Sequence, residues 1–201
     1  MRRAPALAAV AAGLAACAIP RPVPGGLPAP VGTYRAEIEP GDGRAIRFRL
    51  LLWVEAPGRL HAEVVSPTGS AFLIVDAGGG RIAVSLPQER SCYAGAAGPE
   101  TIGELLGIPM SVEDLVRAVL DGGLPQGAET AIERVPPRGD GLPESISFES
   151  GGRALRLSRR AIRSGALAPG TGSGSPPPGC DALPLEGLNV GDLLDGASKA
   201  K

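Results

Sequence analysis

A run of alternating side chains that begins after Ala45 constrains the fold of this chain more than any other feature. One parity of the run is apolar and consists of Ile46, Phe48, Leu50, Leu52 and Val54. The other parity starts with Arg47 and Arg49 and ends with Glu55. A period of two predicts a β-strand with one face on a core or cavity and the other largely in water. Leu51 and Trp53 interrupt the polar parity, which indicates either cover by a neighbouring segment or an exposed apolar patch.

Short turns rich in glycine and proline divide the neighbouring sequence into further strands. Turns at 56–58, 66–70 and 76–80 separate the strands predicted after the alternating run, which are 59–64, 71–75 and 81–86. A short alternating strand over 33–38 comes before the run. Strands joined by such short turns pair with their neighbours in sequence, so we expect an antiparallel meander.

Two predicted helices follow the meander. The first covers 99–106 and stops at Gly107, and the second is capped by Ser111 and stops at Gly122. Strands are predicted again over 130–135, 145–149 and 155–162. An antiparallel sheet of seven or more strands can curl around two such helices. Full packing then gives a closed core, whereas incomplete packing leaves an apolar cavity suited to acyl chains.

The N-terminus carries an export signal. Arg2 and Arg3 precede an apolar run over 6–14, and small residues lead into Cys17 in the sequence Leu14-Ala15-Ala16-Cys17. This stretch resembles the lipobox of bacterial lipoproteins, which implies that residues 1–16 are removed and that Cys17 becomes lipidated. On this interpretation, residues 17–32, which are rich in proline and glycine, form a lipidated tether. The alternative is an ordinary secretory signal with a chance cysteine. Ala18, where lipoproteins of the inner membrane often carry Asp, favours an anchor in the outer membrane, facing the periplasm.

The C-terminal part contains a linker and a last short element. Residues 164–180 are a Gly/Ser/Pro segment, either mobile or draped over the surface. Residues 181–201 contain an apolar stretch that predicts an edge strand or short helix before a polar tail. Apart from Cys17, the chain has only Cys92 and Cys180. An oxidising periplasm would favour a disulfide between them, and two free thiols are the alternative.

The inventory of reactive side chains argues against an enzyme. The one histidine, His61, lies on the outward side of its predicted strand, and no spacing of ligands indicates a metal site. We therefore expect no catalytic residue, no metal and no cofactor. Removal of Arg2 and Arg3 leaves 18 basic against 21 acidic residues, and only 3% of residues are aromatic. This balance gives no basis for binding nucleic acid.

Two motifs give the chain a resemblance to a known family. The hairpin Leu60–Ser70 is similar to the strand–Pro-x-Gly-Ser–strand hairpin of LolB-type outer-membrane lipoprotein receptors. Thr101–Met110, followed by Ser111–Leu120 and Gly122–Pro125, resembles the helical insert of that family. The resemblance covers about residues 45–160. It implies that residues 33–163 form a LolB/LolA-like domain, mainly β with inserted helices (α+β), in which an antiparallel, unclosed half β-barrel wraps around two short helices.

The resemblance also implies an apolar cavity on the concave side of the half-barrel. Its predicted lining is Phe48, Leu50, Leu52, Leu60, Val64, Phe72, Ile74, Ile102, Leu105, Leu115 and Val119. In LolB-type receptors the turn between the two hairpin strands carries a protruding leucine that contacts the membrane during insertion. Thr68 occupies that position here.

The implied function is that of a monomeric, non-enzymatic lipoprotein that binds acyl chains or whole lipoproteins. It would accept lipoproteins from a periplasmic carrier for insertion into the outer membrane. The alternative is an accessory or scaffold lipoprotein that recruits protein partners to an envelope assembly. Thr68, Leu51 and Trp53 favour this alternative, because they place a polar residue at the insertion turn and apolar residues on the outer face.

Overall fold

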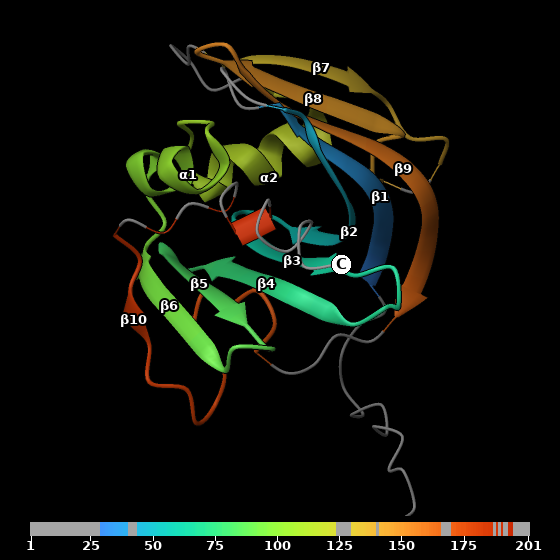
Figure 1. The fold of residues 1–201 in the computed structure, drawn as a ribbon. Coiled ribbons are helices and arrows are strands. Elements are labelled where there is room, and N and C mark those ends of the chain that lie inside the picture. The colour runs from blue at the N-terminus through green and yellow to red at the C-terminus, as the bar shows by residue number, and fades with distance from the viewer. Residues whose placement is uncertain are drawn as a thin grey trace, which may run out of the picture.

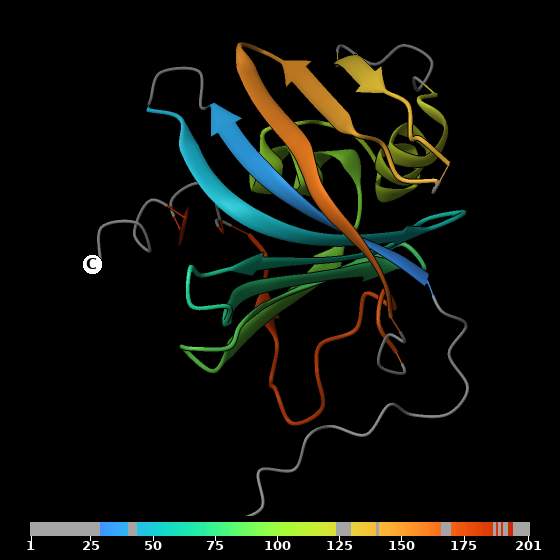
Figure 2. The same ribbon diagram turned by 90° about the vertical axis from the view of Figure 1, so that its right-hand side faces the viewer.

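The architecture is a curled antiparallel sheet with two helices on its concave side (Figures 1 and 2). The computed structural model describes residues 29–39, 44–123, 130–139, 141–165, 170–186, 188, 190 and 193–194. The predicted signal peptide, Cys17 and residues 17–28 of the predicted tether therefore lie outside the described residues, as do parts of the predicted linker and tail.

The described strands form one sheet of ten, in the order β10-β6-β5-β4-β3-β2-β1-β9-β8-β7. The bounds of the elements are β1 (Ala29–Glu39), β2 (Ile46–Glu55), β3 (Arg59–Val65), β4 (Ala71–Gly78), β5 (Arg81–Leu86), β6 (Ser91–Ala96), α1 (Pro99–Leu106), α2 (Val112–Asp121), β7 (Ala131–Val135), β8 (Ser145–Ser150), β9 (Arg153–Gly165) and β10 (Leu183–Pro184). Neighbouring strands are antiparallel except for β10, which runs parallel to β6. The edge strands β7 and β10 do not meet, so the predicted unclosed half-barrel around two helices is confirmed.

Four strands differ from the sequence-based prediction. β4 continues to Gly78, into the predicted 76–80 turn, and β9 continues to Gly165, into the predicted 164–180 linker. β1 begins at Ala29 rather than Thr33, because residues 29–32 pair with the end of β9. These residues were predicted to belong to the tether, since proline and glycine are rarely found inside strands. β6 was not predicted at all. Its sequence, Ser-Cys-Tyr-Ala-Gly-Ala, has neither apolar alternation nor several β-branched residues, and pairing with β5 selects the extended conformation.

Both helices follow their predicted bounds closely. The Ser111 hydroxyl accepts a hydrogen bond from the Asp114 amide (3.1 Å) and donates one to the Asp114 carboxylate (2.8 Å), which caps α2. α1 and α2 end at Gly107 and Gly122, whose φ angles of 74° and 72° lie in the left-handed region. The apolar faces of both helices are buried against the concave face of the sheet. None of the helices in the described ranges is long and apolar enough to cross a membrane.

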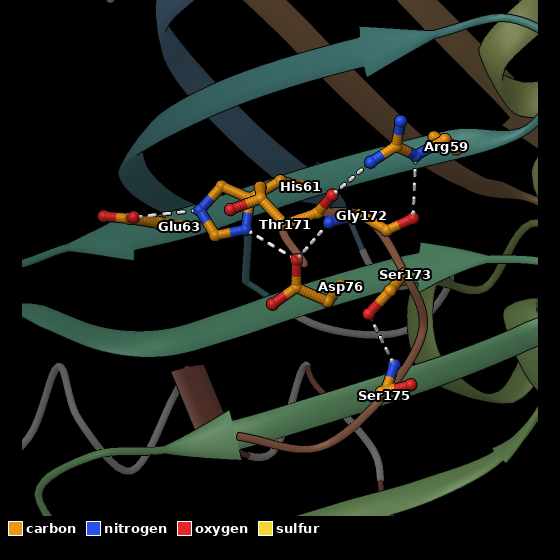
Figure 3. Close-up of polar contacts among 8 residues, drawn as sticks. All are labelled: Arg59, His61, Glu63, Asp76, Thr171, Gly172, Ser173 and Ser175. Carbon is orange, nitrogen blue, oxygen red and sulfur yellow. Dashed lines mark hydrogen bonds and ion pairs between the residues drawn. The ribbon is translucent and has the colours of Figure 1, made fainter. Parts of the chain in front are cut away.

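A loop covers part of the convex face. Residues 170–174, which we call the strap, cross the outer side of β3 and β4 (Figure 3). The Thr171 carbonyl accepts a hydrogen bond from Arg59 Nη2 (2.8 Å), and the Gly172 amide donates one to Asp76 Oδ1 (2.8 Å). This part of the predicted 164–180 linker is thus draped over the surface.

The strap also accounts for Trp53. The indole is only 5% exposed, and the Arg59 guanidinium carbon lies 5.3 Å from its ring centroid. A Cβ atom added to Gly172 would approach Trp53 Cζ3 to 2.6 Å, so the strap and the indole are in close contact. Of the two alternatives for the apolar side chains on the outer face of β2, cover by a neighbouring segment therefore holds for Trp53.

A disulfide connects the far end of the linker to the sheet. Cys92 on β6 and Cys180 are bonded, with their Cα atoms 6.3 Å apart. Of the two alternatives for these cysteines, the structure has the disulfide. It fixes the chain at the sheet edge immediately before β10 pairs with β6.

We expect Gly172→Ala to detach the strap from Trp53. Both Gly172 (φ 70°) and Gly170 (φ 86°) have left-handed backbones, so alanine at either position costs about 1–2 kcal/mol of strain. Only at Gly172 would the new methyl group also collide with Trp53, because nothing lies within 4 Å of the corresponding position at Gly170. Trp53 is the only tryptophan, so its fluorescence reports the change directly. The emission maximum should move to longer wavelength in Gly172→Ala and stay in place in Gly170→Ala. Identical spectra for the two variants would contradict the contact.

Candidate functional site

An apolar cavity lies between the concave face of the sheet and the two helices. It encloses about 90 Å³, and every side chain that lines it is apolar. The lining consists of Ile38, Phe48, Leu50, Leu52, Leu60, Ala62, Val64, Val75, Ala77, Ile82, Ile102, Leu105, Leu106, Val112, Leu115, Val119, Phe148, Leu155, Leu157 and Val190.

Strand register creates the floor of the cavity. Ala62 on β3 lies opposite Leu52 on β2 and opposite Val75 on β4, so the three side chains form a row across the sheet. Leu60 on β3 and Ala77 on β4 lie opposite each other in the neighbouring row on the same face, two residues along each strand from Ala62 and Val75. Because side chains on one face of a sheet repeat every second residue, the apolar alternation within each strand becomes a continuous apolar surface. The helices provide the opposite wall.

Most of the predicted lining residues come together here. Phe48, Leu50, Leu52, Leu60 and Val64 line the cavity from the sheet, and Ile102, Leu105, Leu115 and Val119 line it from the helices. Sequence reasoning missed the contributions of β8, β9 and Val190, because their inward positions are separated from the meander by long stretches of chain.

Phe72 and Ile74 do not line the cavity, and their prediction was wrong. Ile74 lies opposite Glu63, on the outward parity of β3, whereas Val75 and Ala77 line the cavity from β4. The residues from Ala71 to Val75 are all apolar, so alternation could not reveal which parity points inward. A register shift between Val64 and Val65 also interrupts the pairing of β3 with β4.

The cavity has the chemistry of a binding site for apolar groups. One water-sized group needs about 10–15 Å³, so a space of about 90 Å³ accommodates roughly six to nine such groups. This is room for part of an acyl chain. No lining side chain offers a donor, an acceptor or a charge, and each methylene group buried there contributes about 0.8 kcal/mol.

His61 belongs to a separate polar cluster on the convex face (Figure 3). Its Nδ1 lies 2.8 Å from Asp76 Oδ1, and its Nε2 lies 2.9 Å from Glu63 Oε1. Burial by itself lowers the pKa of His61, but the hydrogen bonds to Asp76 and Glu63, together with their negative charges, outweigh it and raise the pKa to about 9. The ring is therefore an imidazolium near neutral pH and donates both N–H groups.

This arrangement gives His61 a structural role. An imidazolium with both N–H groups engaged has no lone pair with which to bind a metal or accept a proton. Asp76 also accepts the Gly172 amide, so the cluster connects β3, β4 and the strap. Within the described ranges, no group of His, Cys, Asp and Glu side chains is arranged to hold a metal ion.

Thr68 lies at the exposed turn between β3 and β4. Its hydroxyl is hydrogen-bonded to the Ser66 hydroxyl (2.7 Å), and the Gly69 amide donates to the Ser66 carbonyl (2.9 Å). The turn is therefore polar and internally hydrogen-bonded. Cys17, the predicted lipidation site, lies outside the described residues.

Comparison with known proteins finds a likeness in fold. No protein-family model and no curated protein matches the sequence. Among solved structures, the chain is similar to the crystal structure of a LolA superfamily protein from Nitrosomonas europaea, with a TM-score of 0.46 and 10% sequence identity. The match covers 70% of this chain and 87% of that one. The architecture of this chain is an unclosed, mostly antiparallel sheet with two short helices on its concave face.

We predict that stability falls as the pH rises from about 6.5 to about 9. In this window the folded state keeps the His61 proton, which the unfolded chain with a pKa near 6.5 releases. The stabilisation is fully present below 6.5 and is lost as the pH passes through 9. Urea unfolding at a series of pH values should show a decrease on the order of 1 kcal/mol that His61→Gln removes. Because His61 is the only histidine, NMR can titrate it without ambiguity. A folded-state pKa at or below 6.5 would contradict the cluster.

Proposed function

We propose that this chain is a lipid-anchored lipoprotein of the outer membrane that binds the acyl chains of lipids or lipoproteins. The observation that carries the proposal is the cavity, which lies within an unclosed sheet and has only apolar side chains in its lining. A closed core of this composition would leave no space, whereas the helices here stand away from the sheet by enough to leave about 90 Å³.

Acyl binding of this kind needs no covalent chemistry. A chain moves from one binding protein to another, or into a bilayer, when the second environment buries more of its methylene groups, each worth about 0.8 kcal/mol. The proposed finer role is to accept lipoproteins from a periplasmic carrier and pass them to the outer membrane. Thr68 presents a hydroxyl at the hairpin turn, so we assign this activity to the cavity and not to insertion of the turn into lipid.

The proposed anchor is consistent with the start of the sheet. β1 begins at Ala29, so eleven residues, or twelve Cα–Cα steps, separate Cys17 from the domain. A fully extended chain spans at most about 3.3–3.6 Å per residue, which limits the reach of the tether to roughly 40 Å. A lipid on Cys17 would therefore hold the cavity close to the bilayer that contains its acyl ligands.

One observation that favoured the alternative function, a scaffold that recruits protein partners, no longer does so. A scaffold function would use Trp53 as exposed apolar surface, but the strap covers this side chain and leaves 5% exposed. Thr68 and Leu51 remain compatible with both functions. The cavity therefore favours acyl binding.

We expect Ala62→Phe to fill the cavity and weaken acyl binding. Ala62 lies in the middle of the apolar row between Leu52 and Val75, so a benzyl group there occupies the space of an acyl chain. Losing contact with two methylene groups, at about 0.8 kcal/mol each, reduces affinity by at least roughly tenfold. Titration with the fluorescent fatty acid cis-parinaric acid measures the change. Ala131→Phe, on the exposed side of β7, is the matched control and should bind like the wild type. Failure of the wild-type protein to bind the probe would overturn the proposed function.

We expect Cys17→Ser to release the protein from the membrane. Two or three acyl chains bind a protein firmly to a bilayer, whereas the unmodified tether has no apolar anchor of comparable strength. After cell fractionation and density separation, the wild type should be found with the outer membrane and the variant in the soluble periplasmic fraction. Intact mass measurement should show the acyl groups on the wild type alone. An equal distribution of the two proteins would contradict the anchor.

A further inference from the structure

Positive charge is concentrated on one half of the sheet. β1, β2 and β9 together contain eight arginines and three glutamates, a charge of +5 in a chain whose net charge is −1. Figure 2 looks onto the convex side of these three strands, with the helices behind the sheet. The strap lies over β3 and β4 instead. The convex side of β1, β2 and β9 is therefore a basic surface of its own.

One row of side chains on this surface is balanced within the protein. Glu37 on β1 lies between Arg47 on β2 and Arg156 on β9. Arg47 Nε is 2.6 Å from Glu37 Oε2. Arg156 forms ion pairs with Glu39 (2.6 Å) and Glu149 (3.0 Å). The carboxylates of this row thus neutralise its own arginines.

The next row has no such balance. Arg35 on β1 lies directly opposite Arg49 on β2, and its partner on β9 is Ser158. Both arginines are exposed, and Arg49 donates a hydrogen bond to the Ser66 carbonyl (2.9 Å). Within the described ranges, neither arginine forms an ion pair with a carboxylate. Like charges directly opposite each other destabilise a sheet, so an anion bound by both guanidinium groups would relieve this pair.

Arg163 extends the positive charge toward the start of β1. It is exposed and lies opposite Val31, which precedes Arg35 by four residues on the same face of β1. A strand rises about 3.3–3.4 Å per residue, so the two rows are about 13 Å apart. β1 begins at Ala29, two residues before Val31, where the proposed tether joins the sheet. The arginine face, which we define as Arg35, Arg49 and Arg163, thus reaches the end of the tether.

We propose that the arginine face docks on the phosphate groups of an anionic phospholipid bilayer. Arginine suits phosphate in geometry, because its planar guanidinium group donates two parallel hydrogen bonds to phosphate oxygens. Exposed arginines spread over a sheet face fit an array of headgroups better than one enclosed ion. The bilayer is also the partner that the tether would bring within reach, and in this respect the inference rests on the proposed lipid anchor.

Docking would set the orientation of the domain on the membrane. The helices and the cavity lie on the opposite side of the sheet from the arginine face, so they would face the periplasm. Each arginine close to an anionic bilayer strengthens binding about fivefold, and the effect fades within a Debye length of about 8–10 Å. Three arginines therefore strengthen binding by roughly a hundredfold when all of them reach the headgroups.

The first experiment measures vesicle binding without the lipid anchor, so that the acyl groups do not contribute. The full chain with Cys17→Ser is mixed with vesicles of phosphatidylglycerol and phosphatidylcholine in equal amounts, or of phosphatidylcholine alone. Co-sedimentation at low ionic strength measures the bound fraction. We expect this parent protein to bind the mixed vesicles only. Adding Arg35→Gln/Arg49→Gln/Arg163→Gln should weaken that binding at least roughly tenfold.

The matched control is Arg81→Gln/Arg90→Gln/Arg117→Gln, which removes the same charge from exposed arginines elsewhere in the described chain. These three residues lie on β5, in the turn between β5 and β6, and on α2, and the control should bind like the parent protein. Equal losses in the two triple variants would refute the arginine face, because net charge alone would then explain the binding. Failure of the parent protein to bind the mixed vesicles would also refute it, and is the result expected of a face that serves an acidic protein.

A second measurement uses the unaltered, lipidated protein and needs no arginine variant. Phenylglyoxal modifies accessible arginines, and peptide mass mapping reports the rate at each one. The arginine face should react more slowly on vesicles that contain phosphatidylglycerol than on phosphatidylcholine alone, whereas the three control arginines should react equally on both. Equal rates at the arginine face would overturn docking. These outcomes leave the acyl cavity untouched, since cis-parinaric acid binding tests it separately, and fractionation of Cys17→Ser tests the anchor.

Discussion

The structure depends on the packing of two amphipathic helices against the concave face of a sheet that does not close. α2 buries Val112, Leu115 and Val119 toward β2 and β3, while its capped N-terminus and its left-handed glycine fix where it begins and ends. The strands must curl to reach the helices, and their edges stay apart. The same contact that stabilises the fold therefore also defines the cavity. A helix that packed more closely would abolish the cavity.

The two faces of the sheet serve different purposes. The concave face is apolar, and its side chains line the cavity. The convex face carries ion pairs and the His61 cluster, with the strap as an additional layer over Trp53. Residues at successive positions in β3 show the division: Leu60 and Ala62 line the cavity, whereas His61 between them binds Asp76 on the opposite side. The polar cluster and the apolar cavity are thus separated by the thickness of one strand.

The local sequence pattern predicted the features that neighbouring residues determine by themselves, namely strand parity and helix ends. Alternation in β2 identified the inward parity, and the glycines and Ser111 identified the helix ends, because these signals act within a few residues. The pattern failed where tertiary pairing decides the outcome. β1 extends through proline and glycine because β9 pairs with it, and the uniformly apolar Ala71–Val75 takes its orientation from β3. The place of Val190 in the cavity lining could not be predicted, since it depends on contacts with elements distant in sequence.

The attachment of β10 to β6 has a consequence for aggregation. An uncovered edge strand exposes backbone groups that can pair with another chain and start aggregation. β10 occupies part of the β6 edge with a strand that ends in proline, and the disulfide at Cys180 keeps it there. At the other edge, β7 carries the exposed Glu133, whose charge opposes a flat apolar pairing. A curled sheet with both described edges protected in this way resists edge-to-edge association with another copy of the chain.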